Sequence, residues 1–212
     1  MSTTARCQNT SVAAAKFITL EGVDGAGKSS HLAFVSDFLA TKASHVIVTR
    51  EPGGTDLAER LREVVLKEPM QPLVETLLVF AARADHVARV IRPALAAGTW
   101  VICDRFTDAT VAYQGAGKGV PMQLIDRLSE LAHPGLNPDR TIVFDCGYEV
   151  AKQRMAGKTL DRFEREDREF FERVRSAYRA LARAEPGRVR LVDASGSMAD
   201  VRKSLEQHLA FA

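Results

Sequence analysis

The chain has 212 residues, of which 46% are hydrophobic, enough for one domain with a continuous core. Its 29 basic and 27 acidic residues give a formal net charge of +2, so no charge bias favours nucleic acid or a membrane surface as a partner. Three cysteines without a C-x-x-C pair, and no segment typical of a signal peptide or membrane span, predict a cytoplasmic protein. Residues 1–15 are expected to form a loose tail before a domain at 16–212.

The first half of the chain alternates strand-like and helix-like runs. Apolar residues predict a strand at 17–20 and a helix at 31–40. A β-branched run at 45–48 predicts a second strand, ended by Pro52 and the paired glycines that follow it. Thr55 is placed to cap the next helix, and helical spacing recurs from 74 to 97, where Pro93 should bend the helix.

The second half continues the alternation. Apolar runs at 100–103, 141–144 and 189–192 predict strands, and helices are expected at 107–114, 121–133, 148–156, 163–184 and 198–209. Five strands alternating with helices predict a doubly wound α/β fold, with a parallel sheet covered on both faces. Ligands bind beyond the carboxyl ends of such strands, where this chain carries Asp24, Arg50, Glu51, Asp104, Arg105 and Asp193.

A glycine-rich stretch lies between the first strand and its helix. Its spacing, G-x-x-x-x-G-K-S, is that of a phosphate-binding loop and places the fold among the P-loop NTPases. Inward-turned backbone NH groups and the positive end of the helix dipole would cradle a polyphosphate. We expect Lys28 to reach the β- and γ-phosphates and Ser29 to contact Mg²⁺. The loop part of the predicted ATP site is Gly22, Val23, Asp24, Gly25, Ala26, Gly27, Lys28, Ser29 and Ser30.

Further motifs accompany this loop and its preceding Leu20-Glu21-Gly22. They are Thr49-Arg50-Glu51-Pro52-Gly53-Gly54-Thr55, Phe80-Ala81-Ala82-Arg83, Asp104-Arg105-Phe106, Ala112-Tyr113-Gln114-Gly115 and Leu160-Asp161-Arg162-Phe163-Glu164. Together they resemble the thymidylate kinases of the bacterial type, over the chain from about Phe17 to the last helix. The resemblance implies transfer of the γ-phosphoryl group of ATP to the 5′-phosphate of dTMP, giving dTDP and ADP for dTTP synthesis, by a homodimer.

Phosphoryl transfer requires positioning and positive charge around the moving group. Asp104 ends a strand beside the loop, where a carboxylate can hold Mg²⁺ together with Ser29. Arg105 can bridge phosphates with its planar guanidinium, although a local ion pair at an exposed strand end is the alternative for this pair. The predicted catalytic set is Lys28, Arg105, Asp24, Lys158, Arg154 and Arg162.

The resemblance also implies an acceptor site. There Arg50 clamps the acceptor phosphate, Asp24 accepts from the sugar 3′-hydroxyl, and Arg83 donates to a base oxygen. Phe80, three residues before Arg83 on the same helix face, stacks on thymine, with burial in the core as the alternative. His86 is expected on the helix surface. The implied dTMP site is Asp24, Arg50, Glu51, Phe80, Arg83, Arg105, Thr110, Tyr113 and Gln114.

The basic stretch at 154–165 predicts a mobile lid that closes over ATP and excludes water. Lys158 stands where relatives tend to carry arginine, so a point charge replaces a bidentate donor. Arg154 and Arg162 are alternative carriers of this role, and a solvated charged face is the alternative for the whole stretch. Asp193 and Ser195, after the last strand, are expected to border the adenine of ATP.

Two other functions are compatible with a phosphate loop. A deoxynucleoside kinase would need a general base near an uncharged 5′-hydroxyl and would give Arg50 no phosphate to bind. A GTP-controlled binding module would usually carry an N-K-x-D guanine-binding sequence, which does not occur here.

Overall fold

The computed structural model describes residues 14–157 and 161–210. Within these residues one parallel sheet has the strand order β2-β3-β1-β4-β5. The strands are β1 (Phe17–Gly22), β2 (Val46–Arg50), β3 (Trp100–Asp104), β4 (Arg140–Asp145) and β5 (Val189–Asp193). Each lies where the sequence predicts a strand, which confirms the expected parallel sheet.

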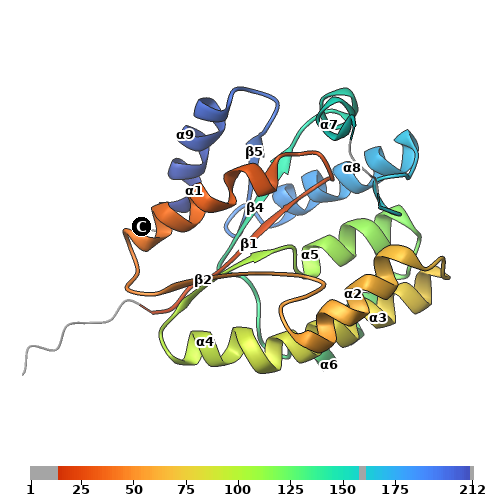
Figure 1. Ribbon diagram of the computed structural model, residues 1–212, viewed down its shortest axis with the longest axis horizontal. Helices are drawn as coiled ribbons and strands as arrows, with labels where there is room; N and C mark the ends of the chain where they lie inside the picture. Colours follow the sequence, from red (N-terminus) through yellow and green to blue (C-terminus); the bar gives the residue numbers. More distant parts are fainter. Residues whose placement is uncertain (1–13, 158–160, 211–212) are drawn as a thin grey trace, which may run out of the picture.

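Helices cover both faces of this sheet, with α1 and α9 on one side and α4 on the other (Figure 1). The doubly wound arrangement is therefore confirmed. The helices are α1 (Lys28–Ala40), α2 (Asp56–Lys67), α3 (Pro72–His86), α4 (Arg92–Ala96), α5 (Thr107–Thr110), α6 (Met122–Ala132), α7 (Tyr148–Met155), α8 (Arg168–Ala184) and α9 (Met198–Leu209), with π-helical turns η1 (Val87–Ile91) and η2 (Val111–Gly117).

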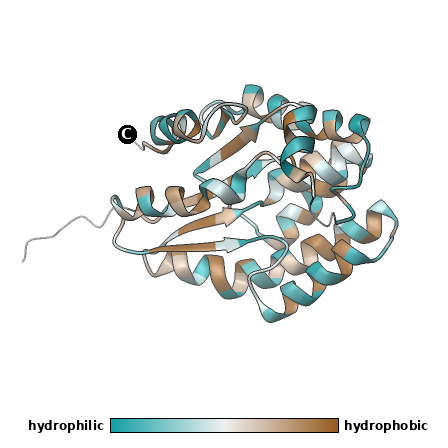
Figure 2. Ribbon diagram, turned by 45° about the horizontal axis from the view of Figure 1, so that its top comes forward, coloured by the Kyte–Doolittle hydropathy of each residue, from teal (hydrophilic) through white to brown (hydrophobic). Residues whose placement is uncertain are grey.

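The central strand β1 is buried along its whole length. Because successive side chains of a strand point to opposite faces, Phe17 joins an apolar cluster with Val87 and Ile91, whereas Ile18 packs in the cluster that contains Val35 of α1. Figure 2 shows these apolar strands between helices that carry both hydrophilic and hydrophobic residues. Burial on both faces explains why the strands read as continuous apolar runs.

The long helix predicted over 74–97 begins earlier and is interrupted earlier than expected. It starts at Pro72, because proline is well suited to the first turn of a helix. The irregularity is the π-helical turn η1, which lies directly before Pro93. In a regular helix the Pro93 ring would clash with the carbonyl group of Arg89, and the wider turn relieves that contact.

Two other helix boundaries differ from the prediction. The helix expected from 163 begins at Arg168, because the Asp167 side chain accepts from the NH group of Phe170 and caps α8 there. The helix expected to end at 114 continues as η2 to Gly117. A Cβ at Gly117 would lie 2.5 Å from the Phe170 ring, so glycine lets η2 pack closely against α8.

Candidate active site

The phosphate-binding loop joins β1 to α1, as the sequence predicts. Gly22, Gly25 and Gly27 have φ values of +132°, +78° and +96°. A Cβ at Gly22 would lie 2.4 Å from the carbonyl oxygen of Phe144, so a side chain there is excluded by contact as well as by backbone strain. Gly27 precedes α1, and no side chain in the described part of the chain caps the helix there, so the NH groups of Lys28 and Ser29 at its first turn can face an anion.

Lys28 and Asp104 lie close enough at this loop for their charges to interact. Lys28 is buried, and its Nζ donates to the Gly22 carbonyl at 3.2 Å. Burial and the neighbouring Arg105 charge lower the pKa of Lys28, against the opposing effect of Asp104. Asp104 Oδ1 is buried and has no hydrogen-bond partner within the part of the chain that the structure describes. An unpaired carboxylate oxygen beside a phosphate loop fits the hard oxygen ligands that Mg²⁺ requires.

Arg105 connects the loop to a neighbouring cavity. Its Nη1 donates to the Gly22 carbonyl at 3.0 Å, and its Nη2 donates to Asp24 Oδ1 at 2.5 Å. The Tyr113 hydroxyl completes the group by donating to Asp24 Oδ2 at 2.8 Å. Burial acts to raise the pKa of Asp24, but Arg105 and Lys28 outweigh it and leave that pKa lowered. Asp24 is therefore ionised at neutral pH.

The backbone of Arg105 is left-handed, with φ +71°. Such a conformation is strained for a residue with a side chain. The Arg105 NH group donates to the Leu20 carbonyl at 3.0 Å, and the Cys103 thiol donates to the Arg105 carbonyl at 3.0 Å. These two contacts fix the backbone of Arg105, and its guanidinium is held at the loop by Gly22 and Asp24.

Glu21 lies beneath this arrangement and was not predicted as a site residue. Its fully buried carboxyl group accepts from the Phe106 NH group and from the Tyr178 hydroxyl, both at 2.7 Å. Burial, together with the negative charge of Asp108, raises the pKa of Glu21 to about 7. Glu21 thus ties β1 to α8 and to the segment after β3.

The cavity beside Arg105 contains most of the predicted acceptor residues. It is bounded by the ends of β1, β2 and β3 and by α2, α3 and η2. Apolar side chains such as Val79 and Phe106 form much of its wall. The predicted residues that line it are Asp24, Glu51, Arg83, Arg105, Thr110, Tyr113 and Gln114.

Phe80 is not among the lining residues, and the predicted stacking on thymine is not supported. Phe80 is only 4% exposed and packs with Val120 and Ile125. Its ring instead lies against the Arg83 guanidinium, 4.8 Å from the ring centroid. Val79, the preceding residue, faces the cavity. The core alternative considered for Phe80 is the one that the packing favours.

Arg50 does not line the cavity either. Its side chain is 55% exposed, and Nη2 donates to Glu59 Oε2 at 2.9 Å. Arg62 of α2, which the sequence did not single out, lines the cavity instead and donates to the Pro52 carbonyl at 2.9 Å. Helical arginines usually form a solvated face, so the spacing of α2 gave no signal for Arg62.

Comparison with known proteins identifies this arrangement. The sequence model of the family "Thymidylate kinase" matches residues 20–205. The chain is 54% identical to a thymidylate kinase of Bordetella petrii over 195 residues, which cover 92% of this chain and 94% of that protein. This chain belongs to the thymidylate kinase family.

Other relatives agree. A thymidylate kinase of Methylobacillus flagellatus is 52% identical over 191 residues, covering 90% of this chain and 94% of the relative. The crystal structure of a thymidylate kinase from Ehrlichia chaffeensis superimposes with a TM-score of 0.77 at 32% identity, covering 93% of this chain and 99% of that one. Membership confirms the predicted P-loop fold and the predicted enzyme class, a nucleoside monophosphate kinase.

The stretch predicted as the thymidylate kinase lid contacts both sides of the site. Arg154 donates to the Ala26 carbonyl of the phosphate loop at 3.3 Å and to the Ala194 carbonyl at 2.8 Å. Ala194 lies between Asp193 and Ser195, so the end of β5 is brought next to the loop. Lys158 lies outside the described residues.

Arg162, at the other end of the lid, is held by two helices. It donates to the Val65 carbonyl of α2 at 2.8 Å and to the Glu75 carboxylate of α3. Glu75 is fully buried and also accepts from Gln114 at 2.8 Å and from Lys118 at 2.9 Å. Glu75 was not predicted as a site residue, since a single acidic residue on a helix has no distinguishing pattern.

His86 is buried, and its predicted place on the helix surface is wrong. Its side chain is 0% exposed, with Nε2 2.7 Å from Thr49 Oγ1 and Nδ1 2.9 Å from Glu51 Oε1. His86 is buried because the last turn of α3 packs against the end of β2, where Thr49 and Glu51 lie.

None of the helices in the described ranges has the length and apolar composition needed to cross a membrane.

Proposed function

We propose that this protein transfers the γ-phosphoryl group of ATP to the 5′-phosphate of dTMP, giving dTDP and ADP, and so serves dTTP synthesis. The proposal depends on one observation above all: Arg105 contacts both the phosphate loop at Gly22 and the cavity at Asp24. A cation in this place lies between a polyphosphate on the loop and a monophosphate in the cavity. That is where negative charge is spread in the transition state of phosphoryl transfer.

On the donor side, the loop NH groups and Lys28 bind the phosphates of ATP. The donor residues proposed are those of the loop from Gly22 to Ser30, with Asp193 and Ser195 next to the adenine. Ser29 and Asp104 are the residues that would hold Mg²⁺, which supplies positive charge to the β- and γ-phosphates when bound. Asp104 Oδ1, which has no hydrogen-bond partner among the residues that the structure describes, supports this role.

On the acceptor side, Asp24 accepts from the sugar hydroxyl and Arg105 donates to the phosphate of dTMP. Arg83, Thr110 and Gln114 converge on the same cavity and are suited to donate to, or accept from, the base. Glu51 and Arg62 line this cavity. Arg50, which pairs with Glu59 in this structure, is assigned to the acceptor phosphate by the family resemblance. No general base is required, because an acceptor phosphate oxygen is already ionised at neutral pH.

The lid supplies further cations to the transferred group. Arg154 already contacts the loop through Ala26, and Arg162 reaches the acceptor wall through Glu75. We assign the catalytic cations of the lid to Arg154, Arg162 and Lys158, acting when the lid closes and excludes water.

The active form is proposed to be a cytoplasmic homodimer. Large apolar side chains are exposed on two adjacent helices, Leu57 and Val64 on α2 and Leu73, Val74 and Leu77 on α3. Exposed apolar residues gathered on neighbouring elements are typical of an interface between subunits. Light scattering at low protein concentration tests the dimer, and Leu77→Asp should shift the protein toward the monomer.

A coupled assay of ADP release with a panel of nucleoside monophosphates tests the reaction. We expect the fastest turnover with dTMP, and faster turnover with dAMP, dCMP or GMP would contradict the acceptor assignment. Greater activity on thymidine than on dTMP would favour a deoxynucleoside kinase. Tight retention and slow hydrolysis of GTP without an acceptor would favour a GTP-controlled module.

A further inference from the structure

Arg83 is fixed in the cavity wall by three of its neighbours. Its Nε donates to Glu51 Oε2 at 2.6 Å, and its Nη2 donates to the Phe106 carbonyl at 3.0 Å and to Thr110 Oγ1 at 3.1 Å. The remaining Nη1 is buried and has no hydrogen-bond partner among residues 14–157 and 161–210. A buried donor left unpaired is costly in the free protein, and because Arg83 lines the cavity, Nη1 is suited to donate to an acceptor oxygen of a ligand bound there.

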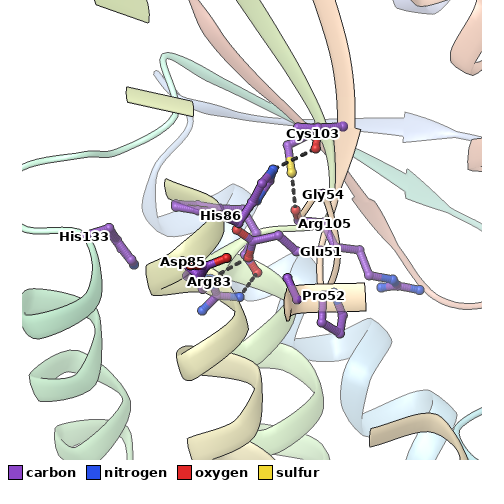
Figure 3. Close-up of polar contacts among 12 residues, drawn as sticks. Glu51, Pro52, Gly54, Arg83, Asp85, His86, Cys103, Arg105 and His133 are labelled. Atoms are coloured by element: carbon purple, nitrogen blue, oxygen red, sulfur yellow. Dashed lines mark hydrogen bonds and ion pairs between the residues drawn. The ribbon is translucent and has the colours of Figure 1, made fainter. Parts of the chain in front are cut away.

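Glu51 is the charged partner of Arg83, and His86 holds Glu51 from the other side. Figure 3 shows the Glu51 carboxylate between Arg83 and His86. Because an ionised carboxylate only accepts hydrogen bonds, His86 Nδ1 is the donor in its 2.9 Å contact with Glu51 Oε1. On the other side of the ring, Nε2 lies 2.7 Å from the Thr49 hydroxyl oxygen, within hydrogen-bond distance. The contacts run from Thr49 through His86 and Glu51 to Arg83.

The turn after β2 keeps the imidazole ring in place. Gly54 has φ +86°, and a Cβ there would lie 2.4 Å from His86 Cδ2 and 2.7 Å from Thr49 Oγ1. The backbone of the turn therefore packs directly against the ring and its partner. His86 and Glu51 are 0% and 2% exposed, so water does not compete for their contacts.

A metal site is the alternative use of these groups. Glu51, His86 and Cys103 offer a carboxylate, an imidazole and a thiol whose ligand atoms lie within 4.8 Å of one another. However, the Glu51 charge is already paired with Arg83, and the Cys103 thiol donates to the Arg105 carbonyl. Burial and nearby carboxylates also raise the pKa of Cys103 well above its usual range, which disfavours the thiolate that a metal needs. The hydrogen-bond network accounts for these groups better.

We propose that His86 is a positioning residue for the acceptor base. It orients the Glu51 carboxylate, and through Glu51 it sets the Arg83 guanidinium at the cavity wall. This inference rests on the proposed role of Arg83 in binding the base of dTMP. Its effect falls on acceptor binding, because the contacts of His86 lead to the cavity and not to the phosphate loop.

Steady-state kinetics of three variants test the proposal. His86→Leu removes both polar contacts and should raise the KM for dTMP about tenfold, the effect of losing one hydrogen bond to a charged group. Its kcat and its KM for ATP should stay within about twofold of wild type on the same reasoning. His86→Asn keeps an NH donor near the position of Nδ1 and should restore most of the affinity for dTMP. Val87→Ala, a matched control at the adjacent buried position, should lower stability but leave both KM values unchanged.

The route through Arg83 is tested by a double-mutant cycle on dTMP binding, measured by calorimetry. In an Arg83→Met background, adding His86→Leu should cause no further loss of affinity. Additive losses of affinity in the double-mutant cycle would overturn the proposal. So would an unchanged KM for dTMP in His86→Leu, or an equal rise of that KM in Val87→Ala. If His86→Leu does not fold, the pair His86→Asn and His86→Gln replaces it, because glutamine reaches toward Thr49 rather than Glu51 and should bind dTMP more weakly than asparagine. A wild-type protein that does not bind dTMP at all would overturn the proposed function itself.

Discussion

Arg105 Nη2 lies 2.5 Å from Asp24 Oδ1, and this contact joins the two halves of the proposed site. Arg105 follows β3, whereas Asp24 belongs to the loop after β1, and β1 and β3 are neighbours in the sheet. The left-handed backbone of Arg105 turns its side chain toward that loop. The resulting ion pair fixes one cation and one anion where two phosphate groups must approach each other.

Asp24→Asn tests this ion pair. The amide keeps the size of the carboxylate but removes the charge that holds Arg105, and one of its terminal atoms becomes a donor facing Arg105 or Tyr113. We expect kcat/KM for dTMP to fall by roughly two orders of magnitude, as for loss of a preorganised charged contact. The exposed Asp126→Asn is the matched control and should behave as wild type. Equal kinetics for the two variants would contradict the assignment.

Lys28→Ala should abolish most turnover. Lys28 is the buried cation at the phosphate loop, and its loss removes charge that stabilises the transferred group. By comparison with deletion of one preorganised donor, kcat should fall by about two orders of magnitude or more. Lys42→Ala, at an exposed position after the same helix, controls for a general change of charge. A Lys28→Ala protein that folds with near-normal kcat would remove Lys28 from the mechanism.

Arg50→Ala and Arg62→Ala distinguish two candidates for the acceptor phosphate. Arg50 is assigned by resemblance and is paired with Glu59, whereas Arg62 lines the cavity. We expect each variant to raise the KM for dTMP with a smaller change in the KM for ATP, and Arg60→Ala, an exposed neighbour on α2, to change neither. An unchanged dependence on dTMP in Arg50→Ala would show that Arg62, not Arg50, serves the acceptor.

Arg162→Met should loosen the lid without unfolding the protein. Glu75 keeps Gln114 and Lys118 as partners in this variant, so the buried carboxylate remains paired. We expect faster amide hydrogen exchange at 161–166 and a lower kcat, with only a small change in Tm. Arg168→Met, which removes an exposed pair with Glu149, is the control and should leave exchange at 161–166 unchanged.

Glu75→Ala removes the common partner instead and should be far more harmful. It leaves Lys118 and Arg162, whose side chains are 11% and 21% exposed, without their shared carboxylate. Breaking a buried ion pair from one side costs on the order of 3 kcal/mol. Urea unfolding measures the loss, and a Glu75→Ala protein as stable as Arg162→Met would show that the buried network adds little.

Glu21 should give stability a measurable dependence on pH. Its pKa is raised from 4.5 to about 7 in the folded protein, so between these values the unfolded chain loses a proton that the folded protein keeps. The contribution of Glu21 to the free energy of unfolding is fully present below pH 4.5 and is lost as the pH rises through about 7. Relative to wild type, Glu21→Gln should therefore become progressively more stable from pH 5 to 8.

Urea unfolding of both proteins at several pH values measures this difference. Glutamine can still accept from the Phe106 NH group and can donate to the Tyr178 hydroxyl, so the buried contacts survive the change. For the control Glu130→Gln, on the exposed face of α6, the free energy of unfolding should depend on pH in the same way as for wild type. Parallel curves for Glu21→Gln would mean that its pKa is close to the ordinary value.

The sequence by itself determined the phosphate loop, the five strands and the end of the sheet at which the site lies. These follow from local features: glycine spacing, short β-branched runs, and the fact that parallel strands end at one edge. Asp24, Arg105 and Gln114 line the cavity because they belong to the segments that follow β1 and β3, and these two strands pair side by side in the sheet.

Only the tertiary structure decided which faces of α2 and α3 meet the cavity. Val79 and Phe80 are neighbours about 100° apart around a helix, so a rotation of α3 decides which one lines the pocket. That rotation is set by packing against α2 and α6, which no local pattern encodes. The packing of α2 and α3 also placed Arg62 in the cavity and Arg50 outside it. It buried His86 and Glu75 against partners that lie more than thirty residues away in the chain.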